Sequence, residues 1–152
     1  MAKYNALIEW EASSTDDVPG GKYGRGHRWT FDENVSVPAS SSKHVVPLPW
    51  SVEAAVDPEE ALVASASSCH MLTFLYLAAK SGYAVQSYRD AAVGTMAKGE
   101  DGRIQITRVD LSPDIIWQGA APDAATLAQL HHDAHDQCFI ANSVKFPIEV
   151  IQ

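Results

Sequence analysis

The sequence is poor in cysteine and in clustered positive charge, and both shortages exclude classes of protein. Only two cysteines occur in 152 residues, Cys69 and Cys138, and no CxxC pair is present, which excludes a zinc ribbon. The 11 basic residues form no block of five or more, so we expect no nucleic-acid partner. No uninterrupted apolar run reaches the ~18 residues of a membrane span, so we expect no membrane partner.

The composition indicates a folded protein of the cytoplasm. Hydrophobic residues make up 46% of the chain and charged residues 20%, which is typical of a globular protein with a core. Glu9 and Glu11 stand where a secretory leader would be apolar, so we expect no leader. The net charge of −8 favours solubility. We therefore expect one domain, residues 1–152, in the cytoplasm.

The clearest structural pattern is a long helix that begins at Asp57 and stops at Gly82. Asp57 suits the N-cap, Pro58 suits the first helical position, and Glu59 and Glu60 complement the positive end of the helix dipole. Gly82 is a suitable C-cap. Because the run between them is apolar on nearly all sides, we expect this central helix to be buried on most faces.

The rest of the chain predicts strands on both sides of this helix and a second helix near the C-terminus. In order, the elements are a half-buried strand at 4–11, a strand or hairpin at 25–37, an extended loop at 38–49, the central helix, strands at 83–98 and 103–117 joined as a hairpin, a helix at 123–137, a helical turn at 138–142 and a closing strand at 146–151. This order predicts an α+β fold.

A long buried helix in so short a chain needs cover on several sides. One sheet supplies too little, so the sequence predicts an intertwined homodimer with the long helices packed between antiparallel sheets.

The two cysteines leave several interpretations open. In a reducing cytosol they are seldom a permanent disulfide, so they are buried thiols, metal ligands or redox-active groups. Glu59 and Cys69 are ten residues apart on the predicted helix, which is ~15 Å along its axis. They do not meet unless the helix kinks or breaks, so spacing alone assembles no site.

The stretch DPEEALVASASSCHM, followed far downstream by CFIANSV, resembles the family of osmotically inducible protein C (OsmC) and organic hydroperoxide resistance proteins. That family has an N/D-P-E-E/Q start, a cysteine ten residues after the glutamate, and a second cysteine that opens a turn. The similarity spans most of the chain, and the segment PASSSKHVVP is similar to an OsmC-like subgroup.

The resemblance implies an α+β fold in which two subunits form one dimer, with active sites at the subunit interface. It implies a thiol-dependent peroxidase in which Cys69 attacks an organic hydroperoxide and becomes a sulfenic acid, and Cys138 resolves it as a disulfide. An external dithiol or other thiol reductant then reduces that disulfide, so no bound cofactor and no metal are implied.

The resemblance also implies that a glutamate and an arginine flank the reactive thiol. Glu59 has the ten-residue spacing and would orient the arginine, which stabilises the thiolate and holds the peroxide oxygens. The family places this arginine in a glycine-flanked strand segment, which here is GGKYGRGHRWTF. We prefer Arg25 to Arg28, because strand alternation puts Arg25 and His27 on one face and Arg28 on the other.

Some residues depart from the family pattern or invite another interpretation. His70 stands where an apolar residue is usual, Phe139 where proline is usual, and the loop from Pro38 to Ser51 carries His44. We expect these differences to bear on substrate identity, with Val45, Val46, Trp50 and Leu72 as candidates to line an alkyl pocket.

The segment HHDAH places His131 and His135 four residues apart on a predicted helix, with His132 between them. This is a spacing that metal ligands use, but the HExxH glutamate is missing, so we favour a polar helix face.

A second hypothesis comes from a different class. On the same fold, the protein would be a non-catalytic binding protein that holds a small hydrophobic ligand, with inert cysteines. Adding one equivalent of hydroperoxide and titrating the free thiols discriminates the two hypotheses, because only the peroxidase would lose thiols.

Overall fold

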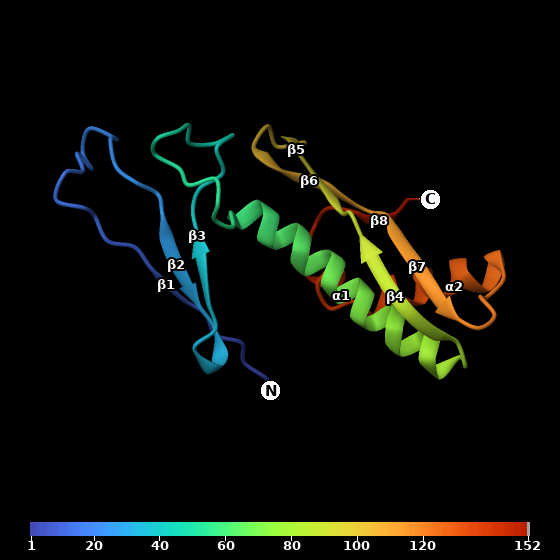
Figure 1. Ribbon diagram of the computed structural model, residues 1–152. Helices are drawn as coiled ribbons and strands as arrows, with labels where there is room; N and C mark the ends of the chain where they lie inside the picture. The colour runs from blue at the N-terminus through green and yellow to red at the C-terminus, as the bar shows by residue number, and fades with distance from the viewer. Residues whose placement is uncertain (152) are drawn as a thin grey trace. The chain divides into compact units, whose positions relative to one another are not determined.

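Two compact units make up the chain in the computed structural model, which describes residues 1–151: residues 1–61, and the residues from 62 onward. Within the described residues the elements run strands, helix, strands, helix, strand, as the sequence predicts (Figure 1). The α+β class is thereby confirmed. The single-domain assignment stays a prediction.

The first unit contains a three-stranded antiparallel sheet in the order β1-β2-β3, made of Leu7–Glu9, His27–Thr30 and Ser36–Ala39. The predicted hairpin at 25–37 is therefore confirmed, with a short turn at Asp32–Asn34 between β2 and β3. The expectation of a half-buried first strand is wrong. β1 is an edge strand only three residues long, and Leu7 and Ile8 are 55% and 58% exposed.

The loop after β3 is irregular, as expected from its prolines, and is held by hydrogen bonds to Ser40. The Ser40 hydroxyl accepts a hydrogen bond from the Val52 amide at 2.9 Å, and the Ser40 amide donates one to the Val56 carbonyl at 3.0 Å. These bonds satisfy buried polar groups and fix the chain that leads into the long helix.

The long helix α1 spans Pro58–Lys80 and begins and ends as its sequence predicts. The Asp57 carboxylate accepts from the Glu60 amide at 2.7 Å, and the Glu60 carboxylate accepts from the Asp57 amide at 3.3 Å, a reciprocal capping box. At the other end Gly82 has φ +84°, and the Tyr83 amide reaches the Ala78 carbonyl at 2.9 Å. This is a Schellman cap.

α1 is buried along one stripe and not on most faces, so that expectation is wrong for the single chain. The buried residues repeat at every fourth position: Ala66, His70, Phe74 and Ala78. Leu72 and Tyr76, by contrast, are 61% and 62% exposed. By length and composition alone, α1 is also apolar enough to cross a membrane, although polar residues interrupt its apolar run.

The second unit contains a bent β-hairpin whose arms divide between two sheets. β4 (Ala84–Asp90) pairs with β7 (Pro113–Gln118), and β5 (Val93–Lys98) pairs with β6 (Ile104–Leu111), all antiparallel. The predicted strands 83–98 and 103–117 are therefore two strands each. The Asp90 carboxylate accepts from the Ser112 amide at 2.7 Å and so links the two bends.

The remaining elements close the second unit. α2 spans Ala124–Gln137 with Asp123 as its N-cap, and β8 (Ile148–Val150) pairs in parallel with β6. The early half of α1 packs on β6 and β8 through Ala66, and the later half packs on β4, β7 and α2 through Phe74 (Figure 1). The two cores hold the two cysteine-bearing segments together.

Candidate functional site

The structure brings the two cysteines together within the second unit. Cys69 lies in the middle of α1, half-buried, and Cys138 is the C-cap residue of α2, 1% exposed. Their side chains lie within hydrogen-bonding contact of each other, and both thiols are free. Residues 69 positions apart in the sequence thus form a thiol pair.

The turn after Cys138 is fixed by side-chain hydrogen bonds, as expected for a short helical turn. The Asn142 amide donates to the carbonyls of Asp136 at 2.8 Å and Cys138 at 3.0 Å, and the Ser143 hydroxyl donates to the Phe139 carbonyl at 2.7 Å. The Ala141 amide points at the Cys138 sulfur, 3.4 Å away. The position of this thiol is therefore set by its own backbone.

The two thiols differ electrostatically. Burial raises the pKa of the Cys138 thiol above its ordinary value, and its hydrogen bond with Cys69 acts in the same direction. A buried thiol resists ionisation because the thiolate loses hydration. Cys138 therefore stays protonated, as an S–H group.

Arg25 and Glu59 lie in the first unit and line one pocket of about 460 Å³. Its other walls are mostly aromatic or apolar, with some small polar side chains: Trp10, Val18, Tyr23, His27, Ser40, Ser41 and Pro58. Glu59 belongs to the first turn of α1, which runs as one helix without a break. Ten residues of continuous helix rise about 15 Å, so Glu59 and Cys69 lie on different turns.

The Arg25 guanidinium rests on its own loop. It lies 3.5 Å from the centre of the Tyr23 ring and donates to the carbonyls of Gly21 and Tyr23. Trp10 packs edge-on against Tyr23 and donates through Nε1 to the Gly24 carbonyl at 2.8 Å. No ion pair joins Arg25 to Glu59 in the described part of the chain.

His27 shares the Arg25 pocket, as strand alternation predicts, and its ring nitrogens are both engaged. Nε2 accepts from Trp29 Nε1 at 2.8 Å, so Nδ1 carries the hydrogen and donates to the Arg25 carbonyl at 2.8 Å. Arg28 points elsewhere and donates to Ser36 Oγ at 2.8 Å. The residues expected to line an alkyl pocket (Val45, Val46, Trp50 and Leu72) are not among the walls of this one.

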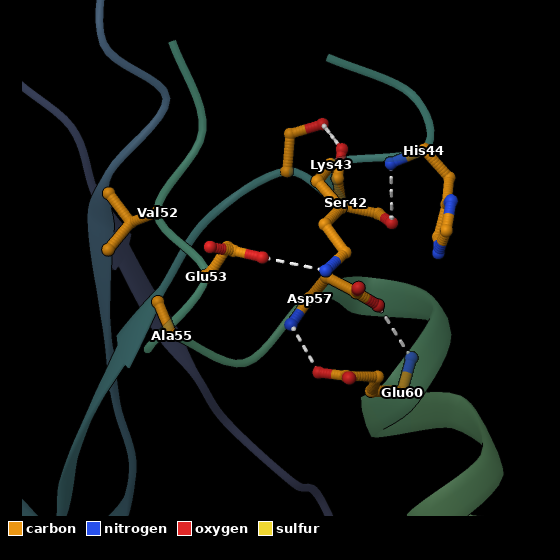
Figure 2. A pocket seen from close by; sticks show the side chains of 9 residues that line it. Ser42, Lys43, His44, Val52, Glu53, Ala55, Asp57 and Glu60 are labelled. Carbon is orange, nitrogen blue, oxygen red and sulfur yellow. Dashed lines mark hydrogen bonds and ion pairs between the residues drawn. The ribbon is translucent and has the colours of Figure 1, made fainter. Parts of the chain in front are cut away.

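His44 lines a smaller pocket of about 170 Å³ elsewhere in the first unit. Lys43 donates a hydrogen bond to Glu53 at 2.6 Å in this pocket. Figure 2 shows this pair beside the Asp57–Glu60 capping box. Its charged groups thus already have partners within the protein.

The histidines of α2 do not form a uniform polar face. His132 is exposed and lies 3.5 Å from Asp136, but His131 is buried, 8% exposed, and contacts His70. The interpretation as a polar helix face is therefore wrong for His131. Among residues 1–151, no group of three or more His, Cys, Asp or Glu side chains is arranged to hold a metal.

The aromatic wall of the pocket and the partner of His70 were not predicted from the sequence. Tyr23 stands two residues before Arg25, which was visible in the sequence, whereas Trp10 stands 15 residues before Arg25 and reaches this segment through a tertiary contact. His70 falls on the four-residue spacing of the buried stripe, and a histidine there requires a polar partner.

Comparison with known proteins identifies close and distant relatives. Residues 51–151 match the protein family described as OsmC: OsmC-like protein. The chain is similar to an OsmC-like protein of unknown function from Vibrio cholerae, with 45% identity and a TM-score of 0.95 over 99% of this chain and 100% of that one. No curated protein matches the chain.

Two more distant structures share the fold. An organic hydroperoxide resistance protein OsmC from Legionella pneumophila is 13% identical, with a TM-score of 0.67 over 99% of this chain and 96% of that one. An organic hydroperoxide resistance protein from Elizabethkingia anophelis is 16% identical, with a TM-score of 0.67 over 98% of this chain and 94% of that one.

Proposed function

Because the chain belongs to the OsmC-like family, we propose that it is a thiol-dependent peroxidase that reduces organic hydroperoxides with Cys69 and Cys138. The observation that carries the proposal is the contact between these two thiols, which are free and unequal in burial. A cysteine that only fills space in a core needs no second thiol beside it, so the pairing favours a chemical role. Two distant relatives named for hydroperoxide resistance support the same reaction.

In the first step, the Cys69 thiolate attacks one peroxide oxygen. An S–O bond forms, the O–O bond breaks, and the departing alkoxide takes a proton and leaves as an alcohol. The more exposed of the two thiols suits this role, because the peroxide must reach it from solvent.

In the second step, the Cys138 thiol gives up its proton and attacks the sulfenic sulfur. An S–S bond forms, the S–O bond breaks, and the hydroxide leaves as water. An external dithiol then reduces the disulfide and restores both thiols. This cycle needs no bound cofactor.

Arg25 and Glu59 complete the proposed site at the subunit interface that the resemblance implies. A guanidinium stays charged at all working pH values and can hold two oxygens at once, which suits it to a thiolate and a peroxide. Glu59 orients it there. The pocket that holds both residues is walled by Trp10, Val18 and Tyr23, which fit an organic substituent on the peroxide.

The proposed partners are an organic hydroperoxide, a thiol reductant and a second copy of the chain. We propose the cytoplasm as the compartment of this OsmC-like protein, because a reducing environment keeps both thiols available.

The test is to add one equivalent of cumene hydroperoxide to the reduced protein and to map its thiols by mass spectrometry. We expect a Cys69–Cys138 disulfide in the wild type. We expect no turnover with Cys69→Ser, and a trapped sulfenic acid at Cys69 with Cys138→Ser. Turnover that survives in Cys69→Ser would overturn the proposal. Two thiols that persist in the wild type would favour the non-catalytic binding protein.

A further inference from the structure

A buried pair of histidines joins the two helices that carry the thiols. His70 lies on α1 directly after Cys69 and is 1% exposed; His131 lies on α2. His70 Nε2 and His131 Nδ1 are 3.1 Å apart, the ring planes differ by 9°, and the ring centres are 5.4 Å apart. These values fit two rings edge to edge in nearly one plane, joined by an N–H···N hydrogen bond along the line between them.

Apolar side chains of both helices pack beside this pair. Phe74 stacks on His131 with ring centres 4.4 Å apart, and the same core joins Phe74 and Ala78 of α1 to Leu130 and Ala134 of α2. Apolar contact is non-directional, so it holds the helices together without fixing how far one has slid or turned along the other. A hydrogen bond requires two named atoms to face each other and so fixes that register.

We propose that the His70–His131 hydrogen bond sets the register of α2 on α1 and thereby holds Cys138 against Cys69, which makes both histidines positioning residues for disulfide formation. Cys69 directly precedes His70, and Cys138 follows His131 by seven residues, about two helical turns. A rotation of α2 that broke the bond would carry Cys138 away from Cys69.

The step served is the resolution of the sulfenic acid, and this part rests on the proposed function. Cys138 attacks the sulfenic sulfur of Cys69, the S–S bond forms, and hydroxide leaves with a proton as water. The attack requires the two sulfurs to be close and aligned, so a loss of register slows this step and leaves the preceding attack on the peroxide unchanged.

The ring that accepts this hydrogen bond must be neutral, since only an unprotonated nitrogen offers a lone pair. Burial lowers the pKa of both histidines, and charge on His131 and His135 lowers that of His70 further. Asp90, on β4, is the carboxylate that opposes this effect. The pair therefore keeps its hydrogen bond at neutral pH.

Three variants separate positioning from simple stability. His70→Leu leaves His131 Nδ1 buried without a partner. His70→Leu combined with His131→Leu removes both polar groups, which restores stability at a buried site. His70→Gln is the conservative variant, because its amide nitrogen stands where ring Nε2 stood and can still donate to His131.

The measurement is the equilibrium between the Cys69–Cys138 disulfide and the dithiol in glutathione buffers, read by mass spectrometry, with urea unfolding in parallel. In His70→Leu we expect the equilibrium constant for forming this disulfide (the disulfide constant) to fall about tenfold, which corresponds to the loss of one hydrogen bond. We expect the free energy of unfolding to fall as well. In the double variant we expect stability to recover while the disulfide constant stays low. In His70→Gln we expect the constant within about twofold of wild type.

A double variant whose disulfide constant recovers along with its stability overturns the proposal. If that variant does not fold, a folded His70→Gln protein with a tenfold lower constant overturns it instead. A protein that forms no sulfenic acid at Cys69 would contradict the proposed function. The glutathione equilibrium involves no peroxide, so it tests the role of the two histidines even in that case.

Discussion

At the scale of single residues, Arg25 and Arg28 stand close in the sequence but differ in what holds each guanidinium. Arg25 is half-buried, rests on Tyr23 and shares a pocket with Glu59; Arg28 is exposed and bonds to Ser36. We expect Arg25→Lys to lower kcat/KM for cumene hydroperoxide about 10- to 100-fold, because an ammonium cannot hold two oxygens in the same geometry.

Arg28→Lys is the matched control for that measurement. It makes the same chemical change three residues after Arg25, at a side chain that does not line the pocket. We expect its kcat/KM to stay within about twofold of wild type. The opposite ranking of the two variants would assign the role of the active-site arginine to Arg28.

The residues that the sequence could identify are those with a motif around them. Cys69, Cys138 and Glu59 were suggested by the resemblance to a family motif, and Arg25 was suggested by the family's glycine-flanked segment together with strand alternation. Trp10 and the His70–His131 pair carry no such pattern, because their roles arise from contacts between segments 14 and 61 residues apart. Composition and periodicity report on neighbours along the chain, so such contacts escape them.

At the scale of elements, the end of α1 depends on a backbone conformation that other residues resist. Gly82 has φ +84°, and a Cβ there would meet nothing within 4 Å, so the cost of substitution is purely conformational. We expect Gly82→Ala to lower the free energy of unfolding by about 1 kcal/mol, measured in urea. Gly24→Ala is the control, since Gly24 has no positive φ and equally open space, and it should change stability little.

The contact between α1 and α2 makes stability depend on pH. Burial, followed by the charges of His131 and His135, lowers the pKa of His70 from 6.5 to about 4, with Asp90 opposing. The unfolded chain therefore binds a proton at this residue near pH 6.5, and the folded protein does not until about pH 4. The contribution of His70 is present in full above pH 6.5 and is lost as the pH falls toward 4.

We expect this loss to reach on the order of 3 kcal/mol, measured by urea unfolding at closely spaced pH values. His70→Gln should flatten the curve between pH 4 and 6.5, because its side chain does not titrate there. An equally steep curve in that variant would mean that other groups cause the slope.

The order of the elements was predictable, but the division of the hairpin between two sheets was not. Residues 91–92 are Ala-Ala and carry no turn signal, so the sequence predicts an unbroken strand over 83–98. The two bends lie together because the Asp90 carboxylate accepts a hydrogen bond from the Ser112 amide, and these residues are 22 positions apart in the sequence. Such a tertiary bond overrides the local pattern.

At the scale of the whole molecule, the exposed side of α1 is the strongest argument for the predicted dimer. Leu72 and Tyr76 are four residues apart on this helix and are 61% and 62% exposed. We expect the wild type to sediment as a dimer in analytical ultracentrifugation, and Leu72→Glu to shift it toward the monomer, because a buried unpaired carboxylate is costly.

Ala125→Glu is the control for that variant. It adds the same charge to an exposed position in the first turn of α2, where a carboxylate is favourable, and it should leave the sedimentation unchanged. A wild-type monomer at micromolar concentration would contradict the predicted dimer.

The burial of Cys138 has a practical consequence for labelling the protein. With one sulfur enclosed and the other accessible, the native fold offers a single addressable thiol although the polypeptide contains two. A spectroscopic probe carried by a maleimide will therefore report from the middle of α1, and a second equivalent will attach only after the fold opens.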